Sequence, residues 1–473
     1  MFVILRPAVR VWTEATRGSL ACIMPRSFYQ ARTLGLNHCF LPFLPASRPL
    51  SRKSIEVEEE PRWLWPLDFN SRMFFEGHKV GARYSCVVNL INTTQPIHHH
   101  VIINTLYHLC KKTPFLGVNI KTRDDQLWYC QDEHFNLNFQ MLEEGTSVIK
   151  ELQKLSKEGL GTEDAPLMKV RMIPGVTDAP CAFPEFKKDF PHQYAIIFFV
   201  HHSIMDGNSM AYMLQAFVEV LDSVLRGQSV DNTKQIGVFV SHQEITEKEL
   251  LIEKMLNNDQ GRLRELKQEV LASTKSPEIL RGYPAPGGPN PTTHFLHREI
   301  QPERFHKIYL RCKHHGVTFY TALQATVNTA IVELLKEAGI NDEVFNISVS
   351  NSTSLRRYMA RRPSPTLGVH VYHTTQLVNV DRNVRESFWN FAKIIGSDLK
   401  TLLTSEASLV QSVVRRMTLP PIDPSTYFRT PPPLTSDYIF SSLGDVSALV
   451  SGNTHSVQIS GLTTLAFLCN SPY

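Results

Sequence analysis

The sequence lacks the features that mark membrane-spanning and disulfide-stapled proteins. Its 8 cysteines are scattered singly, with no Cys-x-x-Cys pair and no metal-ligand spacing, which favours free thiols in a reducing compartment. The apolar run that precedes the candidate catalytic residues, 194–200, is far shorter than the roughly 20 residues that a helix needs to cross a bilayer. We therefore expect no transmembrane span.

The body of the chain also lacks an excess of basic charge. The net charge is +4, but residues 1–53 carry seven Arg and one Lys against Glu14 alone, so the remainder has 41 basic and 44 acidic residues. This balance predicts no nucleic-acid-binding face. With 473 residues, 42% of them apolar and 20% charged, the composition is that of a globular protein with one large or two medium domains.

Residues 1–61 are expected to lie outside the folded body. Much of this segment is rich in Arg, poor in acids and interrupted by several prolines, a pattern typical of a disordered leader or a transit segment. The free thiols favour a cytoplasmic location, and the Arg-rich segment makes a mitochondrial location the alternative.

From residue 62 onward, strand and helix patterns alternate, which predicts an α/β architecture. A segment in which seven of ten residues are Gly or Pro, 282–291, is expected to connect an N-terminal subdomain, 62–281, to a C-terminal one, 292–473. A ligand cleft is expected between their sheets. The patterns predict strands over 83–91, 193–200, 294–300 and 343–349, and helices over 99–111, 146–157, 210–225, 246–271, 317–336 and 387–403.

The chemistry-bearing residues follow the strand that ends at residue 200. This apolar run without polar alternation predicts a strand buried on both faces, and it leads directly into a seven-residue segment, His201-His202-Ser203-Ile204-Met205-Asp206-Gly207. Apolar residues then recur at spacings of three and four up to Leu225, and Gly227 predicts the helix end. The motif therefore occupies a strand-to-helix turn.

This placement gives each residue of the turn a chemical interpretation. Successive strand residues point to opposite sides, so only one of His201 and His202 can face a given cleft, and an imidazole with a pKa of about 6.5 can accept a proton at neutral pH. Asp206 is expected to brace the turn through hydrogen bonds or an Arg, and Gly207 to allow a backbone angle that other residues resist. Alternatively, Asp206 is only a helix cap and both histidines are structural. Because HHxxxDG arises by chance only roughly once or twice in a thousand such chains, the functional interpretation is favoured.

On these residues the chain, from residue 62 to its end, resembles the HHxxxDG acyltransferase superfamily. Members include peptide-synthetase condensation domains and alcohol acetyltransferases, which share the chloramphenicol acetyltransferase-like fold. Weaker similarities lie at residues 350–357 (SNSTSLRR), 387–392 (SFWNFA) and 441–444 (SSLG), the last two resembling the alcohol acetyltransferase branch.

The resemblance implies two α/β subdomains, each a mixed sheet with helices, around a central tunnel. It implies that His202 is the general base, that His201 and Gly207 are structural, and that Asp206 points toward an Arg, with Arg356 as candidate. Ser441 and Ser442 are the oxyanion candidates.

The implied activity is transfer of an acyl group other than an aminoacyl group. The donor would be a thioester of coenzyme A or of a phosphopantetheine arm, and the acceptor a hydroxyl or an amine. The implied reaction needs no tightly bound cofactor, no metal and no covalent acyl-enzyme, and a monomer is expected.

Two departures from the family keep a second interpretation open. The chain has no Asp-Phe-Gly-Trp-Gly segment, unlike the plant branch, and it stops soon after Gly444, which makes a truncated C-terminal subdomain one expectation. The alternative function is a non-catalytic relative that binds acyl thioesters or partner proteins. The histidines at 98–100 and 314–315 have no Cys, Asp or Glu three or four residues on, so they are expected to be solvated rather than metal-binding.

Overall fold

The computed structural model describes residues 61–79, 84–131, 137–160, 165–176, 187–284, 298, 300–360, 365–427, 435–445 and 454–467. From Arg62 onward they belong to one compact unit. The expected leader, apart from Pro61, lies outside the described residues, as do most of the connector and most of the strand expected at 294–300.

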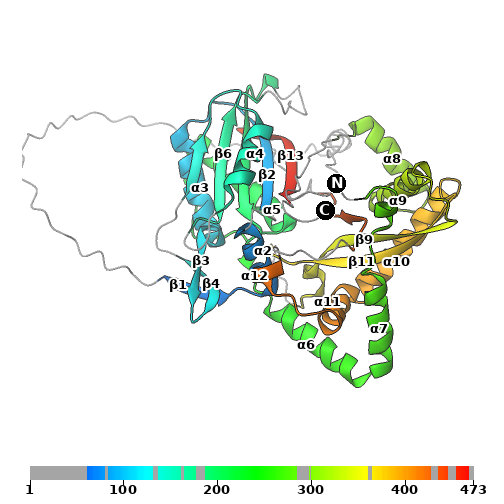
Figure 1. Ribbon diagram of the computed structural model, residues 1–473. Coiled ribbons are helices and arrows are strands. Elements are labelled where there is room, and N and C mark those ends of the chain that lie inside the picture. Colours follow the sequence, from blue (N-terminus) through cyan, green and yellow to red (C-terminus); the bar gives the residue numbers. More distant parts are fainter. Residues whose placement is uncertain are drawn as a thin grey trace, which may run out of the picture. The chain divides into compact units, whose positions relative to one another are not determined.

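In the part of the chain that the structure describes, the first large sheet has five strands in the order β13-β2-β7-β6-β5. All neighbours are antiparallel except β5 and β6, which are parallel. In Figure 1 this sheet runs from β13, in red, past β2 toward β6. The strands are β2 (Tyr84–Thr93), β5 (Asn138–Met141), β6 (Met168–Pro174), β7 (His192–His201) and β13 (Val457–Phe467).

Helices cover both faces of this sheet because β7 carries apolar side chains on both sides. Ile196, Phe198 and Val200 pack in the core that includes α3 (His99–Lys112) and α5 (Gly207–Leu225). The alternate residues, 195, 197 and 199, pack against α4 (Val148–Glu158). The predicted burial of this strand on both faces is confirmed, and α5 ends just before Gly227, whose φ of 65° closes the helix as predicted.

The second large sheet has three described strands, in the order β11-β9-β12. β9 (Val344–Ser354) is antiparallel to β11 (Val371–Asp381) and parallel to β12 (Tyr438–Phe440). Its core contains residues from α9 (Phe319–Glu337) and α10 (Phe388–Thr404). β9 and β11 are the long yellow strands in Figure 1.

Smaller elements complete the described fold. A three-stranded sheet has the strand order β1-β4-β3, and β8 pairs in parallel with β10. No described helix combines the length and apolarity that crossing a membrane requires. The remaining elements are β1 (Arg62–Pro66), β3 (Val118–Arg123), β4 (Gln126–Gln131), β8 (Val238–Phe239), β10 (Thr366–Leu367), α2 (Phe69–Lys79), α6 (Gln243–Asn258), α7 (Gln260–Ala272), α8 (Pro302–His314), α11 (Ala407–Thr418), α12 (Pro424–Tyr427), and the 3-10 turns η1 (Pro114–Gly117), η3 (Glu278–Arg281) and η4 (Leu355–Tyr358).

The structure departs from the expected organisation in two places. The single helix expected over 246–271 is two helices, α6 and α7, because the chain breaks at Asp259, whose carboxylate accepts the Arg262 N–H and caps α7. β13, which lies within the expected C-terminal subdomain, pairs with β2 and so joins the first sheet. The first large sheet therefore contains strands from both expected subdomains.

Candidate active site

The HHxxxDG motif forms the predicted turn between β7 and α5. β7 ends at His201 and α5 begins at Gly207. The Tyr129 hydroxyl donates to the Ser203 carbonyl at 2.8 Å, which fixes the middle of the turn from β4. Asp206 caps the helix, because its Oδ1 accepts the Ser209 N–H at 2.9 Å.

Asp206 also binds Arg356, so capping is only part of its role. Arg356 donates from Nη1 to Oδ2 at 2.5 Å and from Nη2 to Oδ1 at 3.0 Å, and the His370 N–H donates to Oδ2 at 2.9 Å. Burial alone would raise the pKa of Asp206, but the charge and hydrogen bonds of Arg356, with the two backbone N–H groups, outweigh burial and lower it. The carboxylate is therefore ionised and fully engaged.

Arg356 extends this contact into a network around Ser209. Its Nη2 donates to the Ser209 hydroxyl at 2.9 Å, and that hydroxyl donates to the Gly368 carbonyl at 2.8 Å. Its Nε donates to the Thr366 carbonyl at 2.9 Å. The motif is thereby tied to η4, which carries Arg356, and to the segment that follows β10.

The two motif histidines occupy different environments. His201 is 0% exposed, and its Nδ1 accepts the Ser203 N–H at 3.2 Å and lies 2.6 Å from the Ser203 hydroxyl. Burial, with a smaller contribution from His202, lowers the pKa of His201 to about 3, so this ring is neutral. His202 is partly exposed. Two side chains of α2 that the sequence did not single out, Phe74 and His78, stack on the motif rings.

No protein-family model matches the chain, and no curated protein matches its sequence. Solved structures are similar throughout most of the chain. Trichothecene 15-O-acetyltransferase from Fusarium sporotrichioides is 10% identical and superposes with a TM-score of 0.59, covering 86% of each chain. The first condensation domain of the calcium-dependent antibiotic synthetase is 12% identical, with a TM-score of 0.56 over 88% of this chain and 86% of that one.

A further similar structure is polyketide synthase associated protein 5 from Mycobacterium tuberculosis, 12% identical, with a TM-score of 0.54 over 87% of this chain and 88% of that one. The chain has the chloramphenicol acetyltransferase-like fold. This confirms the predicted fold class. At these identities the likeness establishes the fold, so the chemistry depends on the residues of this chain.

In this chloramphenicol acetyltransferase-like fold, the segment at 441–444 lies beside the motif. The role expected for Gly207, to allow a backbone angle that other residues resist, is wrong. Its φ is not in the left-handed region. A Cβ at position 207 would instead overlap the side chain of Leu443, so the glycine makes room for that segment. Ser441 is half-buried and Ser442 is exposed, with the Ser442 hydroxyl accepting the Gly444 N–H at 3.1 Å.

Gly207→Ala is therefore expected to displace Leu443 and to cost about 1 kcal/mol of unfolding free energy, at the low end for overpacking because a leucine methyl can move. Chemical denaturation of Gly207→Ala, Leu443→Ala and the double variant measures the coupling. The double variant should lose less stability than the sum of the two single variants. Strict additivity would show that no contact joins the two positions.

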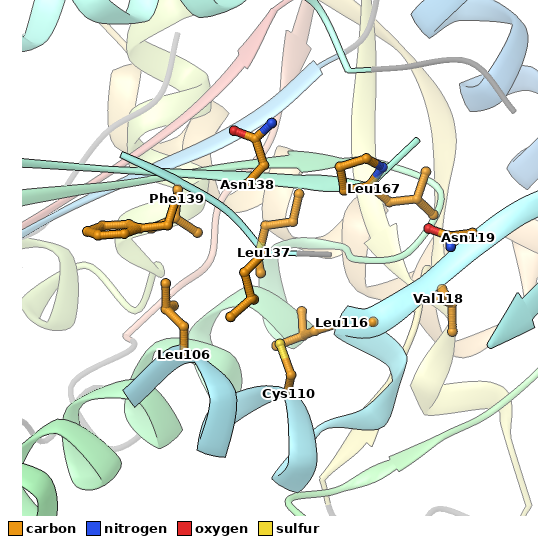
Figure 2. A pocket seen from close by; sticks show the side chains of 13 residues that line it. Leu106, Cys110, Leu116, Val118, Asn119, Leu137, Asn138, Phe139 and Leu167 are labelled. Carbon is orange, nitrogen blue, oxygen red and sulfur yellow. The ribbon is translucent and has the colours of Figure 1, made fainter. Parts of the chain in front are cut away.

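A small pocket elsewhere in the described residues does not border His202. It lies between α3, η1, β3 and β5 and is lined mostly by apolar side chains, as Figure 2 shows for Leu106, Leu116 and Phe139. It has room for about one water molecule. Burial raises the pKa of Cys110 at its edge to about 12, so this thiol is not a nucleophile.

The structure thus pairs Asp206 with Arg356 on the turn that carries His201 and His202, and places Leu443 of the SSLG segment against Gly207. The expected central tunnel remains a prediction. Among the residues that the structure describes, no three His, Cys, Asp or Glu side chains converge as metal ligands would.

Proposed function

We propose that this protein is an acyltransferase in which His202 acts as general base on the acceptor. One observation carries the proposal: of the three titratable side chains in the motif, only His202 reaches the surface. His201 is 0% exposed and neutral, and Asp206 is 4% exposed, with both oxygens occupied by hydrogen bonds. The turn therefore offers one side chain for proton transfer.

The proposed reaction is direct transfer from a thioester. His202 removes the proton of an acceptor hydroxyl or amine as that group attacks the thioester carbonyl, and then protonates the departing thiolate. A neutral His201 assists because it places no positive charge beside the imidazolium that forms on His202. Ser441 and Ser442 are the proposed hydroxyl donors to the oxyanion.

The donor is proposed to be an acyl-coenzyme A, or a phosphopantetheine thioester. The fold supports this assignment coarsely, because it is shared with an O-acetyltransferase and a condensation domain. The alternative, a protein that binds acyl thioesters without turning them over, has the same fold but would not use His202.

The test is incubation of the full chain with a series of acyl-coenzyme A thioesters and a pool of alcohols and amines. Thiol release and the mass of the acylated product are followed together, because hydrolysis releases thiol without making that product. We expect acceptor-dependent thiol release. Binding of acyl-coenzyme A with no product from any acceptor class would support the non-catalytic alternative and overturn the proposal.

A further inference from the structure

Helix α2 places two aromatic rings against the two motif histidines. Phe74 stacks on His202 with ring centroids 4.2 Å apart and planes inclined by 11°. His78 stacks on His201 with centroids 3.6 Å apart and planes inclined by 14°. Because residues four apart on a helix lie on the same face, one face of α2 covers both histidines.

The helix that carries these rings is itself held firmly. Asp68 accepts the Ser71 N–H at 2.9 Å and so caps its first turn. Phe75, beside Phe74, is 1% exposed and packs in the core shared with α3 and α5. α2 also contacts β7 and α12. The two stacking rings therefore belong to an element fixed on several sides.

His78 also contacts the backbone of the motif. Its Nε2 accepts the His202 N–H at 3.2 Å, so this nitrogen carries no proton and the neutral His78 ring is protonated at Nδ1. Likewise, Nδ1 of His201 accepts the Ser203 N–H, which assigns the proton of that ring to Nε2. Both structural histidines are thus held in defined tautomers by backbone groups of the turn.

We propose that Phe74 and His78 are positioning residues for the base, an inference that rests on the proposed function of His202. Phe74 fixes the plane of the His202 ring, and its π face favours the imidazolium that forms when the acceptor loses its proton. His78 fixes the backbone from which that ring projects. Neither residue exchanges a proton with substrate.

The activity test compares Phe74→Leu with Phe74→Tyr. Loss of a cation–π contact predicts that kcat falls about tenfold in Phe74→Leu, while KM for donor and acceptor stays unchanged. Tyr retains a π face, so Phe74→Tyr should restore most of kcat. The matched control is Phe69→Leu on the same helix, because Phe69 is 52% exposed and should have no effect.

A second measurement needs no turnover and separates this inference from the proposed function. Ring protons of His202 that face Phe74 should be shifted upfield in the NMR spectrum of the full chain, and the shift should be lost in Phe74→Leu and regained in Phe74→Tyr. If the wild type acylates nothing but the shift behaves in this way, the stacking holds and the proposed function fails. If Phe74→Leu leaves both kcat and the ring signals unchanged, the inference is overturned.

For His78, the pair to compare is His78→Gln and His78→Leu. A glutamine oxygen can accept the His202 N–H in place of Nε2, whereas leucine cannot. We expect His78→Gln to retain several-fold more kcat than His78→Leu at matched thermal stability. Equal kcat in the two folded variants would exclude the hydrogen bond as a positioning contact.

Discussion

Replacing His202 by alanine is expected to lower the turnover of acyl transfer at least about a hundredfold, since general-base catalysis contributes typically 10² to 10⁴ in rate. The fold should survive. His202 is partly exposed in a turn, and the N–H that His78 accepts belongs to the backbone, which alanine retains. We expect the unfolding free energy to change by no more than about 1 kcal/mol. Steady-state kinetics and thermal unfolding of the purified protein measure the two quantities.

His201→Ala is the informative contrast, because we expect its main effect to be on stability rather than on turnover. The His201 ring is fully buried and stacked on His78, so its removal leaves a cavity and should lower stability by roughly 2–4 kcal/mol. His98→Ala, at an exposed position, should change neither quantity. A folded His202→Ala variant that turns over at the wild-type rate would exclude His202 as the base.

Much of the fold could be predicted because the spacing of apolar residues along the chain indicates which local segments form the strands and helices of its cores. The run at 193–200 predicted a strand buried on both faces, and the three-and-four spacing up to Leu225 predicted α5; both are present. The pairing of β13 with β2 could not be predicted, because these strands lie more than 350 residues apart. Strand partners so distant are selected by tertiary packing, and no local periodicity specifies them.

The candidate site could likewise be predicted only in part. The motif identified His201, His202 and Asp206, and the resemblance suggested Arg356, which the structure places on Asp206. Phe74 and His78 could not be predicted, because a Phe and a His in an amphipathic helix do not indicate which distant turn they contact. The role expected for Gly207 was wrong for a similar reason: a glycine can provide backbone freedom or space, and only the packing of Leu443 distinguishes them.

Arg356→Met is expected to lower the unfolding free energy by roughly 3–5 kcal/mol, because removing one partner leaves the other charge buried and unpaired. Asp206 would keep the N–H groups of Ser209 and His370 but lose the guanidinium. Activity should fall as well, since the turn that holds His202 is tied to η4 through this pair. Denaturant unfolding monitored at pH 7 measures the loss.

The pH dependence of stability gives an independent test. In the wild type the pKa of Asp206 is lowered in the folded state, so the stability from this carboxylate is present above the unfolded pKa of about 3.9 and is lost as the pH falls through the folded value. In Arg356→Met, burial acts on Asp206 without the guanidinium and raises that pKa. The stability difference between wild type and variant should therefore be largest near neutral pH and shrink on acidification.

An exposed ion pair on the same protein provides the control. Arg262 and Glu265 lie 3.0 Å apart with side chains 53% and 66% exposed, so Arg262→Met should cost less than about 1 kcal/mol. Adding Asp206→Asn to Arg356→Met removes the stranded charge while keeping a capping oxygen, so the double variant should recover part of the stability lost in Arg356→Met. If the double variant recovers none, or if Arg356→Met costs no more than Arg262→Met, the buried pair does not brace the turn. The orientation of His202 would then depend on the contacts from α2 and on the hydrogen bond from Tyr129 to the turn.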